Sequence, residues 1–204
     1  MTESCAFIGD IHGNIQALDG LLGILKPLRP ELMVFLGDYV NRGPASRSVI
    51  ERLLELREEA GQQVVTLAGN HELAMLDCIK NGAVARFLKM GGASTIANYV
   101  TWAHSNVASQ FAQSVPVDHI RFLEELENEF ETDTIIARHQ APSAAETRKF
   151  RVGGHVRTGT FPIISANFAL LDTGCSGEGD GRLTAMLWPS RSILQVDAQG
   201  NVIP

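Results

Sequence analysis

Short apolar runs alternate with polar loops and amphipathic stretches, and this order repeats three times in the first 80 residues. The apolar runs cover residues 5–8, 33–36 and 64–67. Apolar residues then recur at helical spacing from residue 15, from about residue 46 to 60, and from residue 73 to 79. Strands that alternate with helical crossovers predict a parallel sheet of βαβ units.

Each apolar run ends in a loop that carries chemically capable side chains. The three loops contain Asp10 and His12, then Asp38, Asn41 and Arg42, then Asn70 and His71. Ligands collect at the carboxyl edge of such sheets, so an acid there can hold a metal and an arginine can hold an anion. Taken alone, the loop after residue 36 also fits a surface turn with a capping aspartate.

The second half of the chain gives a less regular pattern. Residues 81–118 are expected to form a helical cover, and Asp118 to cap a helix whose apolar face extends to Phe130. Two further apolar runs end at His139 and His155. Strand candidates at residues 168–171, 183–187 and 193–196 are separated by a glycine-rich turn and Pro189, which favours antiparallel pairing and a second, mixed sheet.

Length and charge restrict the class of protein. A chain of 204 residues, 45% hydrophobic and 20% charged, with no break in composition, predicts one domain over residues 1–204. Its formal charge of −6 and isoelectric point near 5.5 argue against a nucleic-acid partner or an acidic membrane surface. A substrate anion would therefore be captured locally, by metals and one or two arginines.

Cysteine usage and hydropathy predict a cytoplasmic protein. Cys5, Cys78 and Cys175 are odd in number and far apart, so they are expected to be reduced and buried, without a disulfide framework or a structural zinc site. The first four residues carry no basic leader, and no run approaches the length of a membrane span.

Six side chains at predicted strand ends supply only oxygen and imidazole donors. They are Asp10, His12, Asp38, Asn70, His139 and His155. This donor set suits manganese, iron or zinc, and two such ions about 3.5–4 Å apart can activate water and hold both oxygens of a phosphoryl displacement. Asp38 is the candidate for a carboxylate shared by both ions.

Four motifs, taken in order, resemble those of calcineurin-like metallophosphoesterases, most closely the phosphoprotein-phosphatase branch with its bacterial serine/threonine phosphatases. The motifs are Gly9-Asp10-Ile11-His12-Gly13, Gly37-Asp38-Tyr39-Val40-Asn41-Arg42-Gly43, Gly69-Asn70-His71-Glu72 and Gly154-His155. Residues 172–174 and 181–186 also resemble the terminal hairpin of bacterial relatives. The resemblance implies an α/β fold, a four-layer αββα sandwich of two mixed sheets.

The resemblance also assigns roles to these residues. It implies one metal at Asp10, His12 and Asp38, and a second at Asp38, Asn70, His139 and His155. Manganese is the first choice for both ions, with iron and zinc as alternatives. Arg42 is expected to bind phosphate, and His71 to protonate the leaving oxygen.

The chain departs from the family pattern in three places. Asn41 stands where the family usually has the aspartate partner of the acid histidine, and its amide oxygen could accept a hydrogen bond from His71 without stabilising a charged ring. The segment between His139 and His155 is short, so neither Arg148 nor Arg151 is assigned as a second phosphate-binding arginine. His139 is followed by Gln140-Ala141-Pro142 in place of the common Ala-Gly.

The function predicted from these features is hydrolysis of phosphomonoesters, including phosphoserine and phosphothreonine proteins, by a hydroxide held between two metals. The expected partner is thus a phosphorylated small molecule or a phosphoprotein. One alternative is hydrolysis of a dinucleoside polyphosphate such as diadenosine tetraphosphate. A second alternative is a binding protein on the same scaffold with weakened catalysis, for which Asn41 is the motivating observation.

Overall fold

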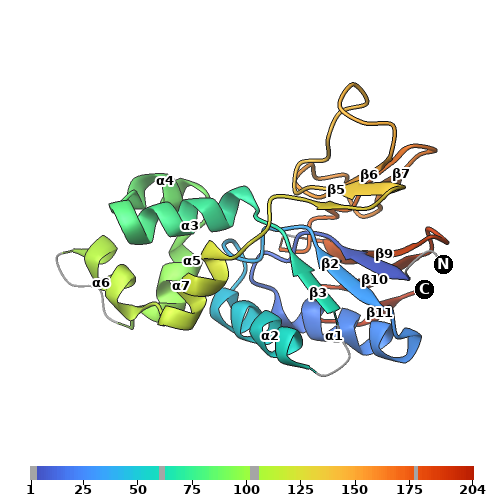
Figure 1. The fold of residues 1–204 in the computed structure, drawn as a ribbon. Coiled ribbons are helices and arrows are strands. Elements are labelled where there is room, and N and C mark those ends of the chain that lie inside the picture. The colour runs from blue at the N-terminus through green and yellow to red at the C-terminus, as the bar shows by residue number, and fades with distance from the viewer. Residues whose placement is uncertain (1–3, 60–62, 102–105, 177–178) are drawn as a thin grey trace.

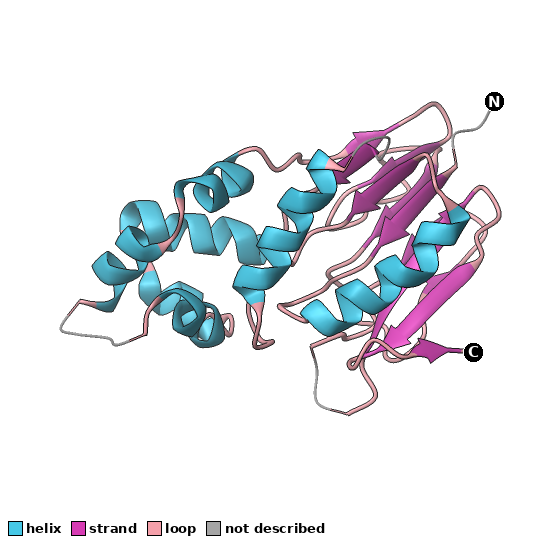
Figure 2. Cartoon of the chain, turned by 90° about the horizontal axis from the view of Figure 1, so that it is seen from below, coloured by secondary structure: helices cyan, strands magenta, loops and turns pink. Residues whose placement is uncertain are grey.

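The structure, a computed structural model, describes residues 4–59, 63–101, 106–176 and 179–204. Two β-sheets pack face to face, helices α1 and α2 lie on the outer side of one sheet, and a group of helices gathers at one end of the sandwich (Figures 1 and 2). The predicted α/β class, with two mixed sheets flanked by helices, is confirmed.

The first sheet has the strand order β11-β10-β9-β1-β2-β3. Strands β1 (Cys5–Ile8), β2 (Leu32–Phe35) and β3 (Gln63–Thr66) are parallel, as predicted, with Phe7 opposite Val34 and Val34 opposite Val65. Strands β9 (Arg182–Trp188), β10 (Ile193–Asp197) and β11 (Val202–Ile203) add antiparallel neighbours beside β1.

Three helices follow the strands of the βαβ units: α1 (Ile15–Leu25), α2 (Ser46–Glu58) and α3 (Asn70–Asn81), with a 3₁₀ turn η1 (Lys26–Leu28) after α1. Asn14 caps α1 as expected, because its side-chain oxygen accepts a hydrogen bond from the backbone N–H of Ala17 at 3.0 Å. Helix α3 begins earlier than predicted, so Asn70 and His71 lie in its first turn.

The predicted helical cover consists of α4 (Val84–Lys89), α5 (Ala93–Tyr99), α6 (Val107–Ser114) and α7 (Val117–Glu124). These helices pack around the buried rings of Phe87, Phe111 and Phe122. The prediction that Asp118 caps a helix extending to Phe130 is wrong, because α7 begins at Val117, places Asp118 inside its first turn and ends at Glu124. Phe130 belongs to a strand instead, and its ring lies 6.0 Å from that of Phe7 in the core between the sheets.

The second sheet has the order β4-β5-β6-β8-β7, formed by β4 (Phe130–Glu131), β5 (Ile135–Ala137), β6 (Phe150–Gly153), β7 (Ile163–Ile164) and β8 (Phe168–Leu170). Only one of the three late strand candidates, β8, joins this sheet, and it runs parallel to β6. Strands β9 and β10 pair with each other as expected but extend the first sheet, because the buried run of β9 pairs with β1.

Two apolar clusters hold these layers together. One lies between the sheets and includes Phe7, Val34, Val152 and Met186. The other joins the opposite face of the first sheet to the helices. After Glu124, the described residues form strands, turns and loops, so the described helices flank the first sheet and its end. Among the described residues, none of the helices has both the length and the apolar character needed to cross a bilayer.

Candidate functional site

Loops from both sheets meet at one edge of the sandwich. Asp10 and His12 follow β1, the segment from residue 38 to 42 follows β2, and His139 and His155 follow β5 and β6. Backbone hydrogen bonds join these loops: the N–H groups of Ile11 and His12 donate to the carbonyl of Asp38 at 3.1 and 2.8 Å. All nine residues predicted for the site therefore belong to one cluster of loops and one helix start.

The backbone at this edge is conformationally unusual. Five site residues have left-handed φ values: His12 (47°), Asp38 (54°), Asn41 (72°), Arg42 (67°) and His155 (64°). Such conformations are costly for residues with a Cβ atom, and strain of this kind concentrates at functional sites. The strain is maintained by the hydrogen bonds that join the loops.

Gly154 allows one loop to approach another closely. A Cβ atom on Gly154 would lie 2.0 Å from Oδ1 of Asp10, so a larger residue would push the loops apart. With glycine there, the backbone N–H of His155 donates to the carboxylate of Asp10, at 3.2 Å from Oδ1 and 3.1 Å from Oδ2. Gly154, which follows a strand of the second sheet, therefore helps to position Asp10, which follows a strand of the first sheet.

Four donor atoms converge between the two sheets. Oδ1 of Asn70 lies 3.0 Å from Nε2 of His139 and 3.0 Å from Nδ1 of His155, and the two ring nitrogens are 3.2 Å apart. Oδ1 of Asp38 lies 3.3 Å from Nε2 of His139. Ligands that bind one ion at about 2.1 Å lie roughly 3.0–3.4 Å from one another. These spacings fit a single metal ion.

A second group of donors adjoins the first. Nε2 of His12 lies 3.6 Å from Oδ2 of Asp38 and 3.9 Å from Oδ2 of Asp10. Asp38 thus presents Oδ2 to this group and Oδ1 to the group around His139. A carboxylate shared by two ions has this arrangement.

The histidines are prepared to act as neutral ligands. Nδ1 of His12 faces the carbonyl of Val40 at 3.1 Å, and Nδ1 of His139 faces the carbonyl of Leu36 at 2.9 Å. A proton on each Nδ1 donates to these carbonyls and leaves a lone pair on Nε2. Burial lowers the pKa of His12 well below its usual range and that of His139 to about 4, so both rings are neutral at neutral pH.

The carboxylates are crowded and buried. Burial raises the pKa of Asp10 and Asp38 well above the ordinary value, and nearby acids raise the pKa further, chiefly Asp172 for Asp10 and Glu72 for Asp38. A cation bound beside such crowded, buried carboxylates would stabilise their charged form. The donor set and its electrostatics therefore both fit divalent metal ions.

Arg42 contacts histidines of the site. Its Nη1 lies 2.8 Å from Nε2 of His12, and its Nη2 lies 3.4 Å from Nε2 of His71. Burial, and then the charge of Arg42, lower the pKa of His71 to about 3.

Asn41 and His71 are in contact, as the motif comparison predicts. The two residues are joined by a contact of 3.0 Å between Nδ2 of Asn41 and Nδ1 of His71, and Asn41 is completely buried. The predicted partner atom was the amide oxygen, whereas in the structure the amide nitrogen faces the ring. Because an amide nitrogen only donates, this difference bears on the tautomer of His71.

Glu72 holds the loops of the candidate site in place, a role that the sequence did not reveal. One carboxylate oxygen accepts hydrogen bonds from the N–H groups of Tyr39 and Val40, and the other from those of Asp38 and Gly69, at 2.8–3.1 Å. Burial raises the pKa of Glu72 to about 7. An acid three residues after the start signal of a helix is the pattern of a capping box, which could have indicated this role.

The remaining candidates have structural contacts. Nη1 of Arg151 donates to the carbonyl of Pro142 at 3.2 Å, and its guanidinium lies over the ring of Phe168. His119 is buried, and its Nδ1 lies 2.9 Å from the hydroxyl of Tyr99. Cys5, Cys78 and Cys175 are buried and form no disulfide, as predicted.

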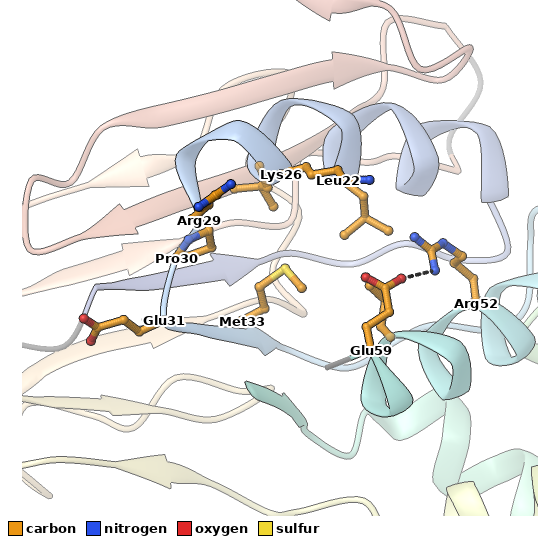
Figure 3. A pocket seen from close by; sticks show the side chains of 10 residues that line it. Leu22, Lys26, Arg29, Pro30, Glu31, Met33, Arg52 and Glu59 are labelled. Carbon is orange, nitrogen blue, oxygen red and sulfur yellow. Dashed lines mark hydrogen bonds and ion pairs between the residues drawn. The ribbon is translucent and has the colours of Figure 1, made fainter. Parts of the chain in front are cut away.

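A cavity of about 390 Å³ lies away from these loops, between the ends of α1 and α2 (Figure 3). Arg52 and Glu59 form an ion pair of 3.0 Å across one side of it. The lining residues are Leu22, Leu25, Lys26, Arg29, Pro30, Glu31, Met33, Arg52, Leu56 and Glu59. This set includes none of the predicted site residues, so the cavity is separate from the metal loops.

Several known proteins share parts of this sequence. A symmetrical bis(5'-nucleosyl)-tetraphosphatase of Acidovorax sp. strain JS42 is 44% identical over 71 residues, 34% of this chain and 24% of the relative. A zinc-dependent endopolyphosphatase of Saccharomyces cerevisiae is 26% identical over 130 residues, 62% of this chain and 37% of the relative. A PP2A-like serine/threonine-protein phosphatase of the same yeast is 31% identical over 94 residues, which are 46% of this chain and 26% of the relative. The chain thus spans less than two fifths of these relatives.

Solved structures share the fold. A protein provisionally named as a diadenosine tetraphosphatase superposes with a TM-score of 0.69 and 22% identity, over 96% of this chain and 94% of that one. A metallophosphoesterase from Sphaerobacter thermophilus superposes with a TM-score of 0.59 and 16% identity, over 99% of this chain and 88% of that one. The model of the calcineurin-like phosphoesterase family matches residues 4–158. The chain therefore belongs to the calcineurin-like phosphoesterase family.

Proposed function

We propose that this protein is a metal-dependent phosphoesterase that hydrolyses phosphomonoesters at a two-metal site. The observation that carries the proposal is the position of Asp38, whose two oxygens face two separate groups of buried donors. One ion would be held by Asp10, His12 and Asp38, and the other by Asp38, Asn70, His139 and His155. Manganese is the first choice, and a zinc-dependent relative supports zinc as the alternative.

Two divalent ions, when bound, activate water for attack on phosphorus and neutralise charge on the phosphate oxygens. The side chains supply the rest of the chemistry. Arg42 carries a guanidinium whose fork suits two phosphate oxygens and stabilises charge in the transition state. His71 would donate a proton to the leaving oxygen from Nε2, the ring nitrogen that faces Arg42 and Asp38.

Phosphomonoesters, including phosphoserine and phosphothreonine peptides, are the first substrate class. Similarity to a serine/threonine-protein phosphatase supports this choice. We also propose that residues 1–204 act as one domain, because the candidate ligands come from both sheets and the sheets share an apolar core.

A second candidate is hydrolysis of dinucleoside polyphosphates. The supporting observation is the 44% identity with a symmetrical bis(5'-nucleosyl)-tetraphosphatase over 71 residues. Both substrate classes would use the same metals, arginine and histidine, since each reaction transfers a phosphoryl group to water.

The experiment compares turnover of an aryl phosphate, a phosphothreonine peptide and diadenosine tetraphosphate with manganese or zinc added. Preference for the peptide supports phosphomonoester hydrolysis, and preference for the dinucleotide supports the second candidate. Metal binding without hydrolysis of any of the three would favour the binding-protein alternative and reject both enzymes.

A further inference from the structure

We propose that Thr95 and Ser46 set the orientation of the Asn41 amide, and through it place the proton of neutral His71 on Nε2. This inference builds on the proposed function, because it concerns the histidine at the phosphoester site. Thr95 and Ser46 are then positioning residues, which act on the site through Asn41.

All members of this chain of contacts are buried. Ser46, the first residue of α2, and Thr95 in α5 are both completely inaccessible, as is Asn41. The backbone N–H of Asn41 donates to the hydroxyl oxygens of Ser46 and Thr95, at 3.0 Å in each case. The two hydroxyl oxygens are 2.8 Å apart, and Oγ1 of Thr95 lies 2.8 Å from Oδ1 of Asn41.

The directions in which the hydroxyl groups of Ser46 and Thr95 donate their protons determine which orientation of the Asn41 side-chain amide is favoured. A hydroxyl has one proton to donate and two lone pairs to accept with. If Ser46 donates to Thr95, then Thr95 donates to Oδ1 of Asn41, and each proton has an acceptor. The amide nitrogen of Asn41 then faces His71.

The reversed amide satisfies fewer groups. Its nitrogen would donate to Thr95, whose own proton would have to go to Ser46. Within the described residues, Oγ of Ser46 contacts only the N–H of Asn41 and the hydroxyl of Thr95. The buried proton of Ser46 would therefore lose its acceptor, which is unfavourable.

The orientation of the amide decides the tautomer of His71. Nδ2 of Asn41 carries protons only, so the Nδ1 atom that it meets at 3.0 Å must accept. The proton of the neutral ring is then on Nε2, which lies 3.7 Å from Oδ2 of Asp38. Nη2 of Arg42 also faces Nε2, at 3.4 Å, but it belongs to an exposed side chain, and its contact is longer than the buried Asn41 contact of 3.0 Å. Nε2 of His71 therefore presents a proton, and not a lone pair, to the side of the site where Asp38 lies.

The same reasoning separates His71 from the metal ligands. Distance alone would group His71 with His12 and Asp38 as a set of three donors. A ring nitrogen that carries a proton cannot bind a metal ion. His71 is thereby kept for hydrogen-bond donation to the leaving oxygen from Nε2, and transfer of a proton requires the doubly protonated ring.

The test is the tautomer of His71 from ¹⁵N NMR near neutral pH, in chelator-treated protein and in protein loaded with zinc, which is diamagnetic. The His71→Gln variant identifies the resonances by their disappearance. The wild-type protein should show a protonated Nε2 and an unprotonated Nδ1 in both states. A protonated Nδ1 in the wild-type protein would overturn the proposal, whatever the variants show.

Variants at Thr95 test the cause. Thr95→Val removes the hydroxyl while keeping the shape, so the amide can turn and the Nδ1–H tautomer should become populated. Thr95→Ser keeps the hydroxyl and should restore the wild-type spectrum, a rescue that a purely structural role would not give. An unchanged tautomer in folded Thr95→Val would reject the role of Thr95. Because the readout needs neither substrate nor turnover, the proposed function can fail without affecting this result.

Discussion

At the scale of single residues, the proposed chemistry depends on a few polar side chains that each contact more than one residue of the site. Arg42 illustrates this, since its guanidinium contacts Nε2 of both His12 and His71. A planar fork of donors can hold two phosphate oxygens at once, which a lysine cannot do. Arg42 is therefore the main anion-binding side chain of the proposed site.

We expect Arg42→Ala to weaken inhibition by inorganic phosphate by about 10- to 150-fold, equivalent to roughly 1.5–3 kcal/mol for hydrogen bonds to a charged group. Arg42→Lys should already weaken it, because the fork is lost. The measurement is the inhibition constant, with Arg121→Ala as a matched control on the exposed face of α7. Unchanged inhibition in Arg42→Ala would place anion binding on other groups, such as Arg148.

Asn41 gives the second prediction at this scale. In Asn41→Asp, a carboxylate oxygen faces Nδ1 of His71 and can only accept, so it stabilises the doubly protonated ring and raises the pKa of His71 from about 3. A larger fraction of doubly protonated His71 near neutral pH helps poor leaving groups most, because they need the proton at departure. We expect kcat/KM for alkyl phosphates to rise roughly 10-fold more than for nitrophenyl phosphate, within the range of general acid catalysis.

The pH profile provides an independent readout for the Asn41→Asp variant. Since the acid form of His71 then persists to higher pH, the alkaline limb of kcat/KM should move upward. Asn167→Asp, at an exposed position, adds the same charge without touching the site. Equal effects on both substrates, with no movement of the alkaline limb, would show that Asn41 does not control the acid.

At the scale of elements, the first turn of α3 joins the loops of β2 and β3 through Glu72. Each of its two oxygens accepts two backbone N–H groups. This contact holds the Asp38 loop in its strained conformation beside Asn70 and His71. Glu72 thus supports both groups of candidate ligands from within a helix.

Glu72→Gln should destabilise the protein by about 2–4 kcal/mol, because the amide NH₂ would face two N–H donors in either orientation and leave them unsatisfied. The measurement is the free energy of unfolding in urea, with Glu127→Gln on the exposed surface as control. A loss below about 0.5 kcal/mol, the usual range of surface changes, would contradict the assigned role.

The elements differ in how far the sequence predicts them. Strands β1, β2 and β3 and their loops are readable because a buried parallel strand needs a continuous apolar run, and each run ends in a recognisable motif. The prediction for Phe130 failed because its helical spacing from Leu123 and Leu126 is accidental, and the pairing of β4 with β5 decides its place. The sheet joined by β9 depends on long-range pairing with β1, which local pattern does not encode.

The candidate site shows the same division. Motif order predicts nine site residues, and the structure brings these nine together, while their roles are proposals. The roles proposed for Thr95 and Ser46 were not predictable, because they depend on the tertiary packing of α5 against α2, which the local sequence pattern does not encode. The direction of the Asn41 amide likewise follows from this buried network and not from the residue type.

At the scale of the whole molecule, the two sheets share the site, so its ionisation affects folding. The pKa of His139, a residue of the second sheet, is lowered to about 4 from 6.5 by burial. A histidine with a lowered pKa stabilises the fold fully above pH 6.5, and this contribution is lost as the pH falls toward 4. The difference corresponds to roughly 3 kcal/mol at most.

We therefore expect wild-type protein, freed of metal with a chelator, to lose up to roughly 3 kcal/mol more stability between pH 6.5 and 4 than His139→Gln does. The comparison between the two proteins is needed because Asp10 and Asp38, whose pKa values are raised, change stability in the opposite sense. Urea unfolding at several pH values measures the difference. Parallel stability curves for the two proteins would refute the coupling.

The central claim is that two metal ions share Asp38 and together support phosphoester hydrolysis. The most direct measurement is the metal content per chain, determined by elemental analysis alongside turnover of an aryl phosphate, for wild-type protein and Asp38→Asn. We predict two ions per chain and chelator-sensitive turnover for the wild type, and fewer ions with at least about 100-fold less activity for folded Asp38→Asn, since a neutral amide cannot replace the shared charge. Two bound ions and near-wild-type turnover in Asp38→Asn would contradict the account.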